Sequence, residues 1–266
     1  MADGMNFDKY IDNPSGGASV ITNRNMYKSM YKEKFDKVLL REQGQIKYTI
    51  YKANDGKDSY YIHIKVPSEV IEKFYYDVVI RLFTTENQKK TKVNLREYAV
   101  QFYSNDPAFV YTFAHAFSKN NLFIDDLKSK MSKKALTTVA KEKNPKDNIW
   151  YVKSLYFAYL TMEKYNLFNR PVLDTNSKKY NAKDLIKEIE DADNKIKARQ
   201  EAQVKLDEDK KKEKQKSANV RKPLEVDTKK SPASKTTAIV KTSAVTKSTK
   251  TSKRVKTIGM KKRGNG

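Results

Sequence analysis

The sequence contains no cysteine, so it can form neither disulfide bonds nor thiolate metal sites. Glycine and proline are sparse, with 8 and 7 copies in 266 residues, and tryptophan occurs once. No apolar run approaches the roughly 18 residues that span a bilayer. The first residues also lack the basic and apolar regions of a signal peptide. These absences favour a soluble protein that has no membrane contact and is stabilised by packing and by partners.

Histidine is nearly absent as well, which bears on catalysis and metal binding. The two histidines, His63 and His115, are about 50 residues apart and have no partner at ligand spacing. The simplest interpretation is that both are structural. An enzyme of unrecognised type that uses one of them is the alternative.

Other signatures of catalysis are missing too. The pair Gly16 and Gly17 is followed by alanine and serine, so no glycine-rich phosphate loop exists. Acid clusters occur at residues 125–126 and 188–191, but on lysine-rich helical segments they are more simply solvated surface charges. We therefore predict a protein that is not an enzyme, with no catalytic residue, no metal site and no cofactor.

Positive charge is concentrated at one end of the chain. Residues 210–266 hold 19 Lys and Arg against 3 acids, so 57 residues supply +16 of the total +23. The first 209 residues carry 36 − 29, or +7. No Phe, Tyr or Trp follows Tyr180, and residues 217–266 show no periodicity, which predicts a disordered basic tail.

A basic tail without aromatics can contact phosphates but cannot stack on bases, so nucleic-acid binding would be electrostatic and independent of sequence. A solubilising or targeting segment without a ligand is an alternative. Anionic lipid is a further one, disfavoured because the tail lacks a bulky apolar face. The candidate nucleic-acid contacts are Lys210, Lys211, Lys212, Lys214, Lys253, Arg254, Lys256, Lys261, Lys262 and Arg263.

The apolar pattern predicts one globular α+β domain over residues 24–180, preceded by an irregular arm over residues 1–23 that orders only against something else. A short helix is expected over residues 25–38. Apolar alternation on both sides of an Asn-Asp-Gly turn predicts a β-hairpin, and two further apolar runs extend it to an antiparallel sheet. The expected strands are residues 46–50, 60–66, 75–83 and 98–103.

The second half of the domain is expected to be helical. Asp106 before Pro107, and Asn144 before Pro145, each combine an N-cap residue with a proline at the first helical position. They predict a helix from residue 106 and a longer one from residue 144 to about residue 165. Residues 123–131 are expected to form a short helix between them, and residues 170–180 a linker.

Residues 181–216 have the composition of a charged helix that projects from the domain. Leu185, Ile189, Ala192 and Ile196 form a thin apolar seam, which ends at Arg199. So short a seam is marginal by itself, so we expect this helix to dock on a partner or fray.

Aromatic residues are dense in the second half of the domain. Helical spacing makes a core role for most of them more frequent than an interface role, although one face has the density to be covered by another subunit. The residues assigned to a subunit interface or to the core are Phe102, Phe109, Phe113, Phe117, Trp150 and Tyr156.

Part of this aromatic region resembles a protein family. The run YAVQFYSNDPAFVYTFA at residues 98–114, the NNLFI that follows at 120–124, the Asn-Pro pair at 144–145 and KSLYFA at 153–158 resemble virion structural proteins of tailed bacteriophages. The resemblance covers about residues 70–165 and includes no catalytic motif. It implies a head, neck or tail component that is made in the host cytoplasm and assembles into a ring or shell of the virion.

The leading hypothesis is therefore an oligomeric virion assembly protein that contacts other virion proteins, with a tail that contacts DNA or an acidic partner. The rival hypothesis is a free protein that binds or condenses nucleic acid without sequence preference. Deletion of residues 210–266 separates the two, because only the rival loses its whole function.

Overall fold

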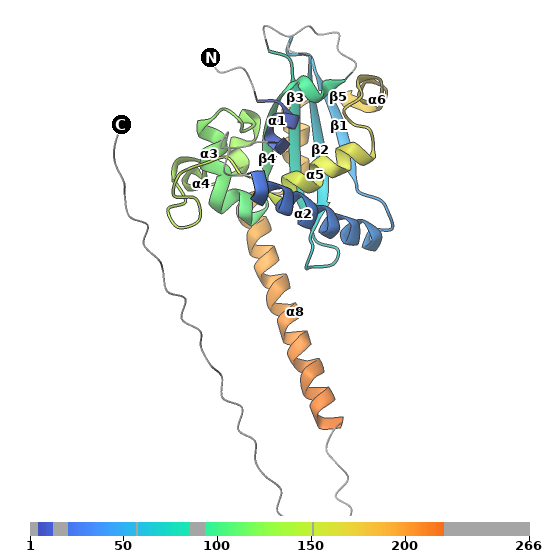
Figure 1. Ribbon diagram of the computed structural model, residues 1–266, viewed down its shortest axis with the longest axis vertical. Helices are drawn as coiled ribbons and strands as arrows, with labels where there is room; N and C mark the ends of the chain where they lie inside the picture. Colours follow the sequence, from blue (N-terminus) through green and yellow to red (C-terminus); the bar gives the residue numbers. More distant parts are fainter. Residues whose placement is uncertain (1–4, 13–20, 57, 86–93, 151, 221–266) are drawn as a thin grey trace, which may run out of the picture. The chain divides into compact units, whose positions relative to one another are not determined.

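A computed structural model of the protein describes residues 5–12, 21–56, 58–85, 94–150 and 152–220. These residues form a five-stranded sheet with helices on both faces (Figure 1), so the α+β class is confirmed. The strand order is β4-β3-β2-β1-β5. The strands are β1 (Tyr48–Ala53), β2 (Ser59–Pro67), β3 (Tyr75–Phe83), β4 (Ala99–Ser104) and β5 (Ser177–Lys179).

The first four strands form the predicted antiparallel meander, with Ile62 of β2 opposite both Ile50 of β1 and Ile80 of β3. In the β1–β2 turn Gly56 has a φ of 73°, a backbone conformation that favours glycine. The sheet as a whole is mixed, because a fifth strand that was not predicted, β5, pairs parallel to β1. The segment predicted as a linker over residues 170–180 instead forms helix α6 (Arg170–Asn176) and β5.

One face of the sheet packs against helix α5 (Lys153–Lys164), and helix α2 (Ile21–Arg41) lies over α5 (Figure 1). Ser104 at the end of β4 lies 3.3 Å from Ser154 of α5, measured between the hydroxyl oxygens. Phe35 of α2 meets Phe157 of α5 edge to face, with ring centroids 5.4 Å apart. Helix α2 is the helix predicted over residues 25–38, extended at both ends.

The described part of the N-terminal arm packs against its own domain, so it needs no external partner to become ordered. It contains helix α1 (Phe7–Asp12), in which Phe7 and Tyr10 are fully buried against the domain itself, and its residues 21–23 belong to α2. The Tyr10 hydroxyl donates to the carbonyl of Trp150 over 3.1 Å. The other residues of the arm, 1–4 and 13–20, lie outside the described residues.

The aromatic side chains assigned to interface or core lie largely within the subunit. Phe102, Phe109 and Phe117 are fully buried, and Phe117 meets the other two rings at centroid distances of 5.6 and 5.2 Å. Tyr156 is 6% exposed, whereas Phe113 and Trp150 are partly buried. These rings therefore pack the interior of the fold.

The Asp-Pro signal at residues 106–107 begins a helical segment as predicted, and the Asp106 carboxylate accepts a hydrogen bond from the Ala108 amide at 3.0 Å. This segment contains η3 (Phe109–Phe113), a π-helical turn, and α3 (Ala114–Lys119). The short helices that follow are η4 (Asp125–Lys130) and α4 (Lys133–Thr137); another, η2 (Leu95–Glu97), precedes β4.

The Asn-Pro pair at residues 144–145 does not begin a helix, so that prediction was wrong. The buried Asn144 side chain instead fastens a loop: it accepts from the Asn148 amide at 3.0 Å and donates to the carbonyls of Asn148 and Thr112 at 2.9 and 3.2 Å. Helix α5 starts later, after Val152.

The other face of the sheet is covered by η4 and by helix α7 (Ala182–Glu188), after which helix α8 (Ala192–Val220) leaves the body. The apolar seam of Leu185, Ile189, Ala192 and Ile196 is buried against the domain, so it needs no external partner. The described core therefore continues past residue 180, and it lies between Phe7 and Ile196.

Candidate nucleic-acid interface

Helix α8 presents the first candidate lysines to solvent. Lys210, Lys211, Lys212 and Lys214 lie on its second half and are exposed. At 1.5 Å per residue, Lys210 lies about 27 Å along the helix from Ala192. The remaining candidates, Lys253, Arg254, Lys256, Lys261, Lys262 and Arg263, lie outside the described residues, as does the prediction of disorder beyond residue 220.

The described side chains of α8 beyond Leu206 are exposed. Its support there is local: the Gln203 amide donates to Asp207 at 3.1 Å, and Lys212 lies 3.7 Å from Asp209. A helix without tertiary contacts is only marginally stable in water. Helix α8 therefore carries lysines away from the body and contributes little to the fold beyond its first turns.

The base of α8 is fixed by a buried charge network on the sheet. Asp77 of β3 is fully buried and accepts hydrogen bonds from His63 at 2.8 Å and from the Asn105 side chain at 2.9 Å. Lys65 of β2 forms an ion pair with the same carboxylate. Burial alone would raise the pKa of Asp77, but His63 and Lys65 outweigh it and lower the pKa to about 2.

This network reaches the junction between α7 and α8. The Glu190 amide donates to Asp77 at 3.3 Å, and the Asn105 side chain donates to the Glu190 carbonyl at 3.3 Å. The Lys65 ammonium donates to the Glu188 carbonyl at 3.4 Å. Asp77 therefore fastens the base of α8 to the centre of the sheet.

Both histidines are held by carboxylates, in keeping with structural roles. His63 bonds Asp77, and its other ring nitrogen lies 3.4 Å from Glu188. His115 bonds Asp147 at 2.9 Å and thereby holds the loop that follows α4. Among the described residues, no group of three or more His, Asp and Glu side chains could hold a metal ion.

The two acids of the cluster at residues 125–126 have different surroundings. Asp125 pairs with Lys128 at 2.6 Å on the surface, as expected. Asp126, in contrast, accepts hydrogen bonds from Tyr61 at 3.1 Å and from Tyr180 at 2.6 Å. The interpretation of the acids as solvated charges was therefore incomplete, because Asp126 ties η4 to the sheet.

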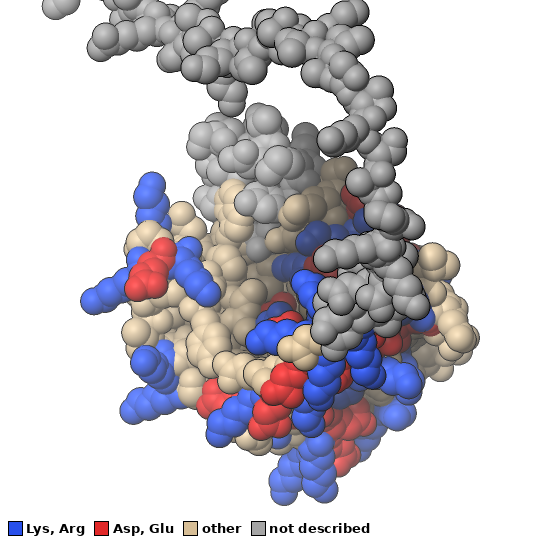
Figure 2. All heavy atoms as spheres, turned by 90° about the horizontal axis from the view of Figure 1, so that it is seen from below, with Lys and Arg blue, Asp and Glu red and all other residues tan. Residues whose placement is uncertain are grey.

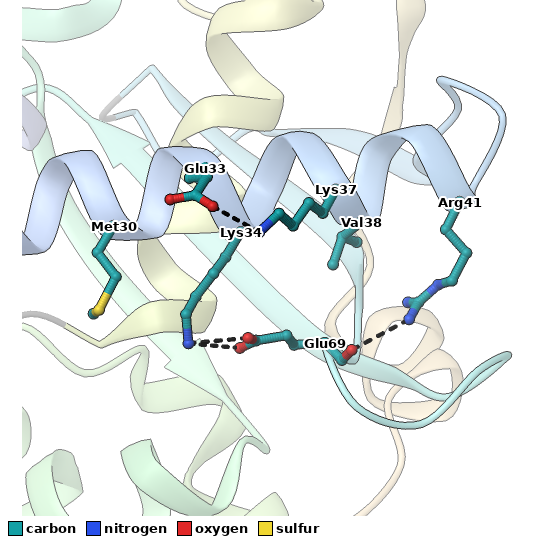
Figure 3. Close-up of a pocket in the computed structure, with 7 residues that line it drawn as sticks. All are labelled: Met30, Glu33, Lys34, Lys37, Val38, Arg41 and Glu69. Atoms are coloured by element: carbon teal, nitrogen blue, oxygen red, sulfur yellow. Dashed lines mark hydrogen bonds and ion pairs between the residues drawn. The ribbon is translucent and has the colours of Figure 1, made fainter.

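A shallow groove of about 320 Å³ lies between α2 and the loop after β2. Its charged side chains form ion pairs with one another (Figure 3): Lys34 pairs with Glu69 at 2.9 Å, and Lys37 pairs with Glu33 at 2.6 Å. This mutual pairing leaves the groove without a distinct preference for a charged ligand. It is lined by Met30, Glu33, Lys34, Lys37, Val38, Arg41 and Glu69.

The sequence analysis missed a second basic surface, residues 128–146, which we name the basic lobe. These 19 residues hold 7 lysines and one acid, Glu142, so their net charge is 7 − 1 = +6. The other 190 residues of the first 209 then carry only 7 − 6 = +1. Charge summed over short windows, rather than over residues 1–209 and 210–266 as wholes, would have found this lobe.

In the described part of the chain, none of the helices combines the length and the apolar composition that a bilayer-spanning segment requires. Comparison of the chain with protein families, with curated proteins and with solved structures found no match.

Proposed function

We propose that this protein is a non-enzymatic assembly protein whose body makes subunit contacts and whose C-terminal basic segment makes sequence-independent contact with nucleic acid. The observation that carries the proposal is the exposure of lysines on a helix whose base is fastened to the body. Helix α8 is fastened at its base by buried Asp77 and holds Lys210, Lys211, Lys212 and Lys214 in solvent, about 27 Å along the helix.

The charge of the segment supports a polyanion as its partner. Beyond residue 209 the chain carries 19 cations, 3 acids and no aromatic residue. Contact with phosphates releases condensed counterions, and it requires neither base readout nor a folded pocket. If about six cations contact duplex phosphates, the logarithm of the binding constant falls with the logarithm of salt concentration at a slope of about −5.

A bacteriophage virion is the assembly that the sequence resemblance suggests, and we keep it as the hypothesis for where the protein acts. The resembling segments, residues 98–114 and 153–158, form β4, η3 and the start of α5, and much of this region is buried. The resemblance therefore concerns the core that would support subunit contacts, whereas the basic segment lies outside it.

Deletion of residues 210–266 tests the proposal. The shortened chain retains the described core, which lies between Phe7 and Ile196. We expect it to form the same oligomer as the intact chain by analytical ultracentrifugation, while its affinity for duplex DNA falls. An intact chain that stays monomeric at high concentration and is absent from particles refutes the assembly function.

The second candidate is a free nucleic-acid-binding protein, favoured by the exposure of the lysines on α8. It predicts salt-sensitive binding by the isolated intact chain and no assembly of the shortened one. The same deletion therefore separates the two functions.

A further inference from the structure

We infer that the basic lobe, residues 128–146, is a second nucleic-acid-binding surface on the folded body. It goes beyond the proposed function, because it places phosphate contacts on the domain itself as well as on the C-terminal segment. The two surfaces can be tested separately.

The first argument is that most of the lysines on the lobe have no acidic partner. Five of its lysines are exposed and form no ion pair with any described residue. The lobe's other two lysines are paired, Lys128 with Asp125 and Lys130 with Asp191. Surface charges of both signs are usually interspersed, and a cluster of one sign raises the local concentration of an oppositely charged partner. The five unpaired lysines are Lys133, Lys134, Lys141, Lys143 and Lys146.

The second argument is that buried and hydrogen-bonded residues hold the backbone of the lobe in place. Met131 is buried, and Ser132 caps α4 by accepting a hydrogen bond from the Ala135 amide at 3.3 Å. Asn144 and Asp147 fasten the loop that follows, through Thr112 and His115 respectively. The lysines therefore stand on a fixed backbone, which reduces the conformational entropy lost when a partner binds.

The third argument concerns position. Lys130, within the lobe, pairs with Asp191 at the base of α8 over 3.2 Å. The lobe therefore borders the base of α8, the helix that carries Lys210, Lys211, Lys212 and Lys214. Seen from below, basic side chains project from the edge of the body that carries α3 and α4, on the left in both views (Figures 1 and 2).

Nucleic acid fits this surface better than a membrane does. The exposed large apolar side chains of the described chain are Leu40, Val70, Tyr111 and Val204, and none of them lies in residues 128–146. A bilayer would need such a side chain as an anchor. Tyr111 immediately precedes Thr112, whose carbonyl accepts a hydrogen bond from the Asn144 side chain.

The test replaces the five unpaired lysines of the lobe with glutamine in the intact chain. A matched variant replaces five other exposed lysines that also form no ion pair among the described residues, and it loses the same charge. Binding to a fluorescent duplex is measured by anisotropy at several salt concentrations. The matched positions are Lys47, Lys73, Lys164, Lys178 and Lys179.

We expect the lobe variant to bind at least about tenfold more weakly at low salt, with a salt slope shallower by about 4 to 5. The matched variant keeps nearly the affinity and slope of the intact chain, because its five lysines lie outside the lobe. Equal binding by the two variants overturns the inference. So does equal binding of the intact chain to anionic lipid vesicles and to DNA.

Lysine acetylation of the unmodified chain gives the same answer without depending on how the variant folds. Bound DNA should protect Lys133, Lys141 and Lys146 and leave Lys47 and Lys178 reactive, as measured by mass spectrometry. A chain that ends at Asp209 separates this inference from the proposed function. If it retains binding that the lobe substitutions abolish, the inference holds; if the deletion removes all binding, the inference fails and the C-terminal contact stands.

Discussion

Replacement of Asp77 by asparagine should release the base of α8 from the sheet. The asparagine keeps the shape of the side chain but loses its charge beside Lys65 and His63. In the native protein the Asn105 side chain and the Glu190 backbone amide both donate to one carboxylate oxygen of Asp77. In the variant the side-chain NH2 group of the asparagine would face these two donors. The substitution therefore leaves buried donors unpaired.

The expected cost follows from the burial of Asp77 and His63, which are 0% and 3% exposed, whereas Lys65 is 33% exposed. Removal of one partner of a buried ion pair typically costs about 3 to 5 kcal/mol. Asparagine retains one acceptor oxygen, so we expect about 3 kcal/mol, which lowers Tm by about 6 to 12 °C for a domain of this size.

The contribution of Asp77 should also depend on pH. Its pKa is about 2 in the folded protein, against 3.8 for an unperturbed aspartate, a difference worth about 2 kcal/mol. Because the folded pKa is the lower one, this stabilisation is complete above about pH 4 and is lost as the pH falls to about 2. The stability difference between the native chain and the Asp77→Asn variant should therefore shrink over that range.

Urea unfolding followed by circular dichroism measures both effects. Hydrogen exchange shows whether the loss is centred on Leu185, Ile189 and Ile196, which the junction holds in place. Glu72→Gln is the control, because Glu72 is exposed and its side chain forms no ion pair or hydrogen bond among the described residues. A cost for Asp77→Asn within about 0.5 kcal/mol of that control would refute the reasoning.

Three further outcomes follow from the fold. Phe7→Ala should cost about 3 to 5 kcal/mol, because Phe7 is fully buried; an unchanged melting curve would show that α1 does not dock on the domain. Asp58→Asn should cost about 2 kcal/mol, because Asp58 holds Arg170 and accepts from the Tyr98 hydroxyl at 2.7 Å; asparagine tolerates the φ of 49° at this position, so the loss reports on these side-chain contacts, and unchanged stability would contradict it. Deletion of residues 210–266 should leave Tm within about 1 °C, since no described core residue lies there, and a clear drop in Tm would contradict this.

The sequence predicted those elements whose own apolar pattern is enough to identify them. Alternation on both sides of Gly56 located the hairpin, and the apolar run at residues 75–83 located β3. In contrast, β5 has the sequence Ser-Lys-Lys and joins β1 through its backbone alone, so no apolar pattern marks it. Asn144 has the composition of a helix start, but its side chain bonds a loop that only the tertiary fold brings together.

Two errors came from treating segments in isolation. The seam from Leu185 to Ile196 is too short to be stable alone, which suggested an external partner. It packs on its own domain, and Asp77 holds the chain there through the Glu190 amide. The basic lobe was hidden because its charge was counted together with 190 nearly neutral residues. Its five unpaired lysines became evident only when the ion pairs of their neighbours were known.

The most direct test of the central claim is the salt dependence of duplex DNA binding by the intact chain, measured beside the chain that ends at Asp209. We predict a steep inverse dependence for the intact chain, with a slope of about −5 or steeper, and a shallower slope after deletion as the C-terminal contacts are lost. A slope near zero for the intact chain, or one unchanged by the deletion, would contradict electrostatic contact between the C-terminal segment and nucleic acid.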